Sequence, residues 1–432
     1  MSTSVLMEAG KSDNSVDIND VKGEPIPFIN IGNTSSGRPR VVAVTQEARA
    51  LLSKIEGPIC VVSAVGLFKC GKSCVLNRVL LPSEVEAFRV DHNESAPCTR
   101  GLWIWSKPLS AQAPDGTDVS VIVMDCEGLD GGENMRERDL CIFSLCLLLS
   151  SYMVYTSVGG LTDESVEKLW GFVHDMTNSV LINPRDGEDR PDENRDITDF
   201  MPKLMWAFRE MNLQRRDESA RQFSSRQHLE RALEEMSAGF GGDRLQQLNK
   251  AKAGLKHLFP DRDCFPLAHL LDVDASLQDS PNKTNDSCLT SRPKHLSVLR
   301  DRILNQAEVK TFYGAEVSGR MLAELAERFV TAINAGNDMC IGDSWAEVCD
   351  RECEGHVEES MACYAEALLA LRPRLPVGSS ELSQWHSAVS AEALELFTTS
   401  TRNLQGGKVR KYALQLEATL KGAWEKLSAD NR

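Results

Sequence analysis

The segment GLFKCGKS, residues 66–73, constrains the fold of this chain more than any other stretch. It has the pattern Gly-x4-Gly-Lys-Ser, in which glycines let backbone N–H groups converge on phosphate oxygens. The lysine of this pattern reaches the β- and γ-phosphates, and the serine hydroxyl binds Mg²⁺. The β-branched run 59–65 precedes it and indicates a buried strand, and a helix is expected near 73–80. The sequence therefore predicts a phosphate-binding loop between a strand and a helix.

Short apolar runs alternate with longer helical patterns across residues 26–300, which predicts a mostly parallel sheet flanked by helices. Further strands are expected at 119–124, 153–155, 204–208 and 264–270, with helices near 138–150, 162–176 and 295–307. The longest apolar run, 140–155, is too short and too interrupted by serine for a membrane span. We expect it to be a buried helix that continues into a strand. The polar stretches 184–198 and 274–295 are expected to be surface loops.

The pattern changes near residue 308. Apolar residues recur at helical spacing up to Ile333, where Gly336 is a plausible stop, and three later segments repeat this pattern without any further strand signal. Those segments are 344–371, 379–403 and 408–428. The expected organisation is a disordered tail at 1–24, a P-loop α/β domain at 25–307 and an all-α helical domain at 308–432.

A P-loop site needs a carboxylate at the end of another strand. Asp125 ends the run VSVIVM and can hold Mg²⁺ through water, and the Gly128 N–H can sense a γ-phosphate. Between the two motifs, the hydroxyl of Thr99 in the segment PCTRGLWIW can complete the Mg²⁺ shell. The candidate metal ligands are Ser73, Thr99 and Asp125.

A base-reading carboxylate is expected after the strand 203–208, in Arg209-Glu210, where it could accept the guanine N1–H and N2–H₂ groups. The alternative pair Arg216-Asp217 has no apolar strand before it and is expected on the surface.

The net charge of −15, with no dense Lys/Arg run, argues against nucleic acid as a partner. The 13 cysteines are scattered, several of them in apolar runs, and no signal peptide precedes them, which favours reduced thiols and a cytoplasmic location. Membrane contact is expected to be indirect at most. Cys349, Cys353 and His356 could suggest a zinc site, but a fourth ligand at the usual spacing is missing and an amphipathic helix is favoured.

Taken together, these motifs resemble the guanylate-binding-protein and atlastin family of dynamin-like large GTPases over residues 26–370. The resemblance rests on GLFKCGKSCVLN, TRGLWIW, MDCEGL, FSLCLLLSSYMVY, PDEN, LFPDRDCF and the entry to the helical region, VKTFYGAEVSGRMLAELAERFVTAINAG. Within this family, the segments EGL and GLWIW favour the guanylate-binding branch. The resemblance implies a large GTPase (G) domain that binds and hydrolyses GTP with Mg²⁺, pairs with a second G domain, and relays its state to the helical domain.

Three positions depart from the family pattern. Lys69 stands where the family has an arginine finger, and a lysine is a point charge without the planar fork of arginine. Pro97 replaces a serine near the attacking water, and Glu210 replaces the aspartate of the guanine-reading pair. An impaired hydrolysis rate is therefore expected, and a nucleotide-binding scaffold that uses GTP only as a shape switch stays an alternative, as does an ATP-binding protein.

By this resemblance the candidate catalytic residues are Lys69, Lys72, Thr99, Glu127 and Gly128. The candidate nucleotide-binding residues are Gly66, Phe68, Lys69, Cys70, Gly71, Lys72, Ser73, Cys74, Arg209 and Glu210.

Overall fold

The computed structural model describes residues 23–33, 39–82, 87–90, 100–129, 136–182, 195–209, 225–236, 242–267, 294–404 and 407–431. The predicted tail lies outside these ranges except for Gly23 and Glu24. Most of the predicted loops at 184–198 and 274–295 lie outside them as well.

A nine-stranded sheet forms the centre of the protein, in the order β10-β9-β7-β3-β6-β4-β1-β2, with β5 also paired to β6. The five strands from β10 to β6 are parallel, and β4, β1, β2 and β5 join antiparallel. The strands are β1 (Pro25–Asn33), β2 (Pro39–Val44), β3 (Ile59–Gly66), β4 (Leu102–Trp105), β5 (Leu109–Gln112), β6 (Asp118–Cys126), β7 (Tyr152–Val158), β9 (Lys203–Arg209) and β10 (Arg262–Pro266). The predicted mostly parallel sheet is confirmed.

Strand β3 is buried on both faces, as its unbroken apolar run predicts. Because successive side chains of a strand point to opposite faces, Val61 and Val65 join one hydrophobic core and Val62 and Ala64 the other. The sheet therefore lies between two packed layers.

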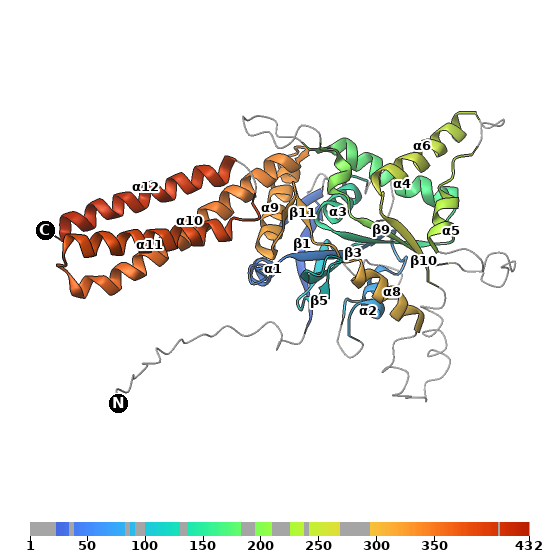
Figure 1. The fold of residues 1–432 in the computed structure, drawn as a ribbon. Coiled ribbons are helices and arrows are strands. Elements are labelled where there is room, and N and C mark those ends of the chain that lie inside the picture. Colours follow the sequence, from blue (N-terminus) through green and yellow to red (C-terminus); the bar gives the residue numbers. More distant parts are fainter. Residues whose placement is uncertain are drawn as a thin grey trace.

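Helices cover both faces of the sheet (Figure 1). Helices α2 and α8 pack on the face of Val62, and α1, α3, α4, α6 and α9 contribute to the core on the other. The bounds are α1 (Gln46–Leu52), α2 (Lys72–Val79), α3 (Arg136–Leu149), α4 (Asp163–Ser179), α5 (Ser225–Ala232), α6 (Gly242–Leu258), α8 (Lys294–Asn305) and α9 (Gly319–Asn334), with a 3-10 helix at Ile197–Phe200. The run 140–155 is α3 followed by β7, as predicted.

The expectation that no strand follows residue 308 is wrong. A hairpin of β11 (Thr311–Phe312) and β12 (Ala315–Glu316) turns through Tyr313 and Gly314, both at positive φ, and β13 (Met339–Cys340) pairs with β8 (Val180–Leu181). Two-residue strands are too short to show a hydrophobic period, so sequence patterns do not reveal them.

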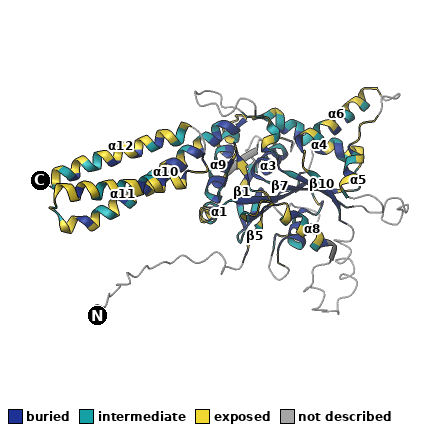
Figure 2. Ribbon diagram, viewed as in Figure 1, coloured by how far each residue is buried: buried dark blue, intermediate teal, exposed yellow. Residues whose placement is uncertain are grey.

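The helices after the sheet form an elongated bundle that extends away from it (Figure 1). It consists of α10 (Ile341–Leu371), α11 (Ser379–Ser400) and α12 (Gly407–Asp430), with a short 3-10 turn at Arg372–Arg374. Its outer surface is largely exposed, whereas the strands are buried (Figure 2). His386 of α11 stacks on Trp424 of α12 and hydrogen-bonds to the Tyr364 hydroxyl of α10 at 2.9 Å, which joins the three helices.

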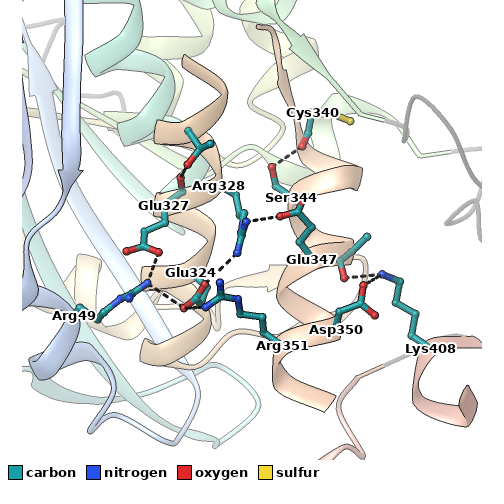
Figure 3. A network of polar contacts seen from close by, with 12 residues as sticks. Arg49, Glu324, Glu327, Arg328, Cys340, Ser344, Glu347, Asp350, Arg351 and Lys408 are labelled. Atoms are coloured by element: carbon teal, nitrogen blue, oxygen red, sulfur yellow. Dashed lines mark hydrogen bonds and ion pairs between the residues drawn. The ribbon is translucent and has the colours of Figure 1, made fainter. Parts of the chain in front are cut away.

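An ion-pair network connects α1, α9 and α10 (Figure 3). Arg49 of α1 pairs with Glu324 and Glu327 of α9, and Glu324 also contacts Arg351 of α10 at 3.5 Å. Arg328 of α9 completes it, with Glu347 of α10 at 2.6 Å. Isolated surface pairs contribute little to stability, but a network fixes the relative positions of the helices that carry it.

Across the described residues, no helix is both long and apolar enough to cross a membrane.

Lys310, just before the hairpin, is buried among apolar groups. Its Nζ donates to the Ser150 carbonyl at 2.7 Å and lies 4.9 Å from the centre of the Phe312 ring. Burial lowers the pKa of Lys310 from 10.5 to about 7. The unfolded chain therefore binds a proton more readily than the folded chain between pH 7 and 10.

This proton difference predicts a pH dependence of stability. The unfolding free energy of the wild type should rise from pH 7 towards pH 10 by up to about 1.4 kcal/mol per pH unit from Lys310 alone. Lys310→Met removes this contribution, so its stability relative to wild type should be greatest near pH 6.5 and should decline at higher pH. Denaturant unfolding of both proteins from pH 6.5 to 9.5 measures the difference. A difference that stays constant with pH would show that Lys310 keeps an ordinary pKa.

Candidate nucleotide-binding site

The candidate residues gather at one edge of the sheet because the strands that carry them are parallel. In the strand register, Ala64 pairs with Asp125 of β6, and Gly66 pairs with Thr156 of β7. Arg209 ends β9, the next parallel strand. The carboxyl ends of parallel strands are the usual ligand-binding edge of such sheets.

The loop between β3 and α2 has the backbone that its glycines predict. A Cβ at Gly66 would lie 2.2 Å from the Thr156 carbonyl oxygen, so only glycine allows this approach. Gly71 is the N-cap of α2 at φ 95°, and Lys69 is also left-handed, at φ 60°. Helix α2 starts directly at Lys72, so its first N–H groups and its dipole face the loop.

The side chain of Lys72 is 6% exposed, and its Nζ donates to the Leu67 carbonyl of the loop at 3.0 Å. Burial pushes the pKa of Lys72 down, whereas nearby groups, among them the Asp125 carboxylate, push it up, and the net shift is upward. The ammonium group therefore stays charged at neutral pH, inside the loop.

Ser73 and Asp125 are in direct contact. The Ser73 hydroxyl donates to Asp125 Oδ2 at 2.6 Å, and Asp125 is fully buried. A hydroxyl and a carboxylate are hard oxygen donors, which suit Mg²⁺ when it takes its other ligands from water and phosphate. The described residues contain no group of three or more His, Cys, Asp or Glu side chains placed to hold a metal ion. These two oxygens therefore fit a phosphate-bound Mg²⁺ and not an all-protein metal cage.

The segment after β6 is fastened to the loop by its backbone. The Phe68 N–H donates to the Leu129 carbonyl at 2.8 Å, and the Leu129 N–H donates to the Gly66 carbonyl at 3.1 Å. Gly128 lies so close that a Cβ there would be 2.7 Å from the Phe68 Cα and 3.1 Å from Lys72 Nζ. The Gly128 peptide is thus held beside Lys72.

Glu127 forms a different set of contacts. Its Oε2 accepts from the Gly101 N–H at 2.8 Å and from Arg138 Nη2, and its own N–H donates to the Gly101 carbonyl at 2.9 Å. Glu127 and Arg138 are 5% and 7% exposed. The structure therefore places this candidate catalytic residue in a buried ion pair.

The remaining loop side chains differ in exposure. Lys69 is exposed, with its Nζ 5.4 Å from the centre of the Phe68 ring. The Cys70 sulfur is 2.7 Å from the Thr156 hydroxyl, and burial raises the pKa of its thiol. Cys74, in the first turn of α2, is buried. The Cys70 thiol therefore stays protonated and is a buried packing group.

Three of the predicted positions, Pro97, Thr99 and Glu210, lie outside the described residues. Arg209 is described, and its carbonyl accepts from the Gly159 N–H at 2.8 Å. Sequence reasoning missed Arg138, Gly101 and the backbone role of Leu129. The sequence around Arg138 does not distinguish a buried arginine from a surface one. For Gly101, the glycine of the segment TRG is a local signal of a tight turn.

The residues considered for a zinc site, Cys349, Cys353 and His356, all lie in α10. Cys349 and Cys353 are buried in α10, and His356 Nδ1 lies 2.8 Å from Glu359 Oε2.

Comparison with known proteins supports the resemblance. Residues 40–311 match the family model "Guanylate-binding protein, N-terminal domain", and residues 313–432 match "Guanylate-binding protein, C-terminal domain". Mouse guanylate-binding protein 3 is 28% identical over 361 residues, which is 82% of this chain and 56% of that protein. Human guanylate-binding protein 2 is 28% identical over 407 residues, or 91% of this chain and 64% of that protein.

Mouse guanylate-binding protein 5 is 28% identical over 414 residues, which is 94% of this chain and 66% of that protein. The chain thus spans between about half and two thirds of the length of the curated relatives it matches. The two family models together cover nearly the whole sheet and all the helices that the structure describes. The chain belongs to the guanylate-binding protein family.

Proposed function

We propose that this chain is a GTP-binding large GTPase that binds and hydrolyses GTP with Mg²⁺. The observation that carries the proposal is the contact between the Ser73 hydroxyl and the Asp125 carboxylate, 2.6 Å apart, beside the buried ammonium of Lys72. This arrangement combines one cation for the β- and γ-phosphates with two oxygens suited to Mg²⁺. Family membership supports the same function, because the relatives are named for guanylate binding.

Guanine is the proposed base because Arg209 ends β9 at the same edge of the sheet as Asp125. Glu210 follows it in the sequence and would accept the guanine N1–H and N2–H₂ groups. Arg209 stands two strands away from the loop after β3, in the order β9-β7-β3. Guanine offers such a carboxylate two adjacent donors, N1–H and N2–H₂, whereas adenine offers only its N6 amino group.

Mg²⁺ would be held by Ser73 and Asp125, with Thr99 as a further ligand. When bound, it would neutralise charge on the β- and γ-phosphates. Lys72 then orients the phosphates, and the Gly128 N–H contacts the γ-phosphate from the other side. These protein groups bind and orient the substrate, which is the main task of a phosphoryl-transfer site.

Lys69 is the residue that favours a second candidate function, a slow or inactive nucleotide-binding scaffold. Its ammonium lies over the Phe68 ring and can offer the transferring phosphate only a point charge. Pro97 and Glu210 add to this expectation from the sequence. In both candidate functions the nucleotide binds in the same way, so only the hydrolysis rate differs.

We also propose that GTP pairs two G domains and that the paired state is relayed to the helical domain at 308–432. The support for the relay is the ion-pair network of Figure 3, in which Arg49 of α1 holds α9 and Glu324 of α9 holds α10. Asp350 of α10 in turn pairs with Lys408 of α12. A shift of α1 would therefore move charges that position the bundle.

The proposed location is the cytoplasm, with any membrane contact indirect. The described cysteines carry no disulfide, which suits a reducing compartment. Cell fractionation would contradict this location if the protein were recovered from the secreted or luminal fraction.

Calorimetry with GTP and ATP, each with Mg²⁺, tests nucleotide binding. GTP should bind tighter than ATP, and Lys72→Ala should weaken GTP binding roughly 10- to 100-fold, because a hydrogen bond to a charged group contributes about 1.5–3 kcal/mol. Lys168→Ala, which removes an exposed cation paired with Glu164 on α4, is the matched control and should bind normally. Equal affinities for GTP and ATP, or an unchanged affinity in Lys72→Ala, would reject the proposal.

Replacement of Lys69 by arginine tests the catalytic part. Lys69→Arg should raise the single-turnover hydrolysis rate, because a planar fork replaces a point charge at the transition state. A gain of about tenfold corresponds to ~1.4 kcal/mol off the barrier. Lys69→Met, with the charge removed, should be slower than wild type at the same GTP affinity. If Lys69→Arg is the slower protein, the residue does not act on the transferring phosphate.

Light scattering tests the pairing. With a non-hydrolysable GTP analogue the mass should be twice the 47.8 kDa of one chain, and with GDP it should equal one chain. The physical reason is that only a triphosphate offers a γ-phosphate for Thr99 and the Gly128 N–H to contact, and this contact would distinguish the paired state from the GDP state. The same mass in the nucleotide-free, GDP and analogue states would leave a monomeric nucleotide sensor.

A further inference from the structure

Three segments of the chain meet at the carboxylate of Glu127. Glu127 follows β6, Gly101 precedes β4, and Arg138 lies in the first turn of α3. A single oxygen, Glu127 Oε2, accepts both the Gly101 N–H at 2.8 Å and a guanidinium N–H of Arg138. The carboxylate and the guanidinium are both more than nine tenths buried.

Because this ion pair is buried, each of its two side chains depends on the other. A buried carboxylate without a cation is strongly unfavourable, so the contact with Arg138 stabilises Glu127 at the Gly101 amide. Position 101 admits only glycine, since it is left-handed at φ 72° and a Cβ there would be 2.2 Å from the Ile29 carbonyl oxygen. The Glu127 N–H also donates to the Gly101 carbonyl, so Glu127 is fixed at both its backbone and its side chain.

The position of Glu127 determines the position of the next peptide. Gly128 lies between Glu127, which is held as described, and Leu129, which is hydrogen-bonded to the loop through Gly66 and Phe68. At this position Gly128 approaches Lys72 Nζ closely. The peptide that is proposed to contact the γ-phosphate is therefore held from two sides, and Arg138 controls one of them.

We infer that Arg138 is a positioning residue for recognition of the triphosphate: through Glu127 it holds the Gly128 peptide where a γ-phosphate can be contacted. The inference rests on the proposed function of the site. It adds a residue that sets the preference for GTP over GDP and the hydrolysis rate without touching the nucleotide. GDP has no γ-phosphate, so its binding does not depend on this contact.

The test compares Arg138→Gln and Arg138→Lys with wild type. The readouts are the affinities for GDP and for a non-hydrolysable GTP analogue, and kcat and KM for GTP. In Arg138→Gln the analogue should bind roughly tenfold more weakly and kcat should fall roughly tenfold, while GDP affinity stays within about twofold. Arg138→Lys keeps the charge and should recover part of both losses. Lys168→Gln, on the exposed face of α4, is the control and should match wild type.

A double-mutant cycle separates positioning from a general loss of structure. If Arg138 acts through Glu127, then Arg138→Gln should add little to the loss already caused by Glu127→Gln, because residues in direct contact are not additive. Should Arg138→Gln alone fail to fold, the double variant Glu127→Gln/Arg138→Gln carries the test, since it leaves no unpaired buried charge. It should fold, bind GDP and lose the preference for the analogue.

Three results would overturn the inference. GDP and analogue affinities that fall together in Arg138→Gln would show that the pair only supports the fold. Unchanged affinities and kcat, in that variant or in the double variant, would show that Gly128 is held without Arg138. Binding of the analogue to the wild type is measured before any variant is made. If the wild type does not bind it, the proposed function itself is rejected.

Discussion

The two hydrogen bonds between Leu129 and the phosphate loop are the contacts on which the rest of the site depends. They join the Leu129 N–H to the Gly66 carbonyl and the Phe68 N–H to the Leu129 carbonyl, so the loop after β3 and the segment after β6 form one unit. Each such bond contributes only about 1 kcal/mol to stability. Their importance is geometric, because they fix the position of Gly128 relative to Lys72, the residue proposed to bind the phosphates.

Electrostatics then decide what this unit can bind. The Lys72 ammonium is buried and stays charged, and the nearby carboxylate of Asp125 is already occupied by the Ser73 hydroxyl. A cation enclosed by backbone at a helix N-terminus favours an anion with several oxygens, such as a di- or triphosphate. The second buried pair, Glu127 with Arg138, precedes and follows Gly128 in the chain and is joined by a hydrogen bond from Arg138 Nη2 to Glu127 Oε2. Lys72 thus supplies the charge that would attract the ligand, whereas the pair of Glu127 with Arg138 stabilises the geometry of the site.

Much of this arrangement could be predicted from the sequence, because its signals are local. The glycines, lysine and serine of residues 66–73 stand next to one another, and the run before them is apolar enough to specify a strand buried on both faces. The strands β1 and β2 at one end of the sheet could not be predicted, since β1 begins with two prolines within three residues and pairs with β4, about 75 residues away. The contact of Arg138 with Glu127 was equally hidden, because burial of a charged side chain depends on the tertiary fold and not on the neighbours in sequence. The ion pairs of Arg49 with α9 join residues 275 and more positions apart, which no local pattern encodes.

We propose that the hydrogen bonds of Leu129 hold the proposed phosphate site in its final geometry before a nucleotide binds. Hydrogen exchange measured by NMR on nucleotide-free protein tests it directly, through the amides of Phe68 and Leu129. Both amides should exchange slowly, with protection comparable to that of Val62 in the buried strand β3, and a GTP analogue should change them little. Rapid exchange of both amides in the free protein, with protection appearing only when the analogue is added, would show that the ligand assembles the site and would contradict the account.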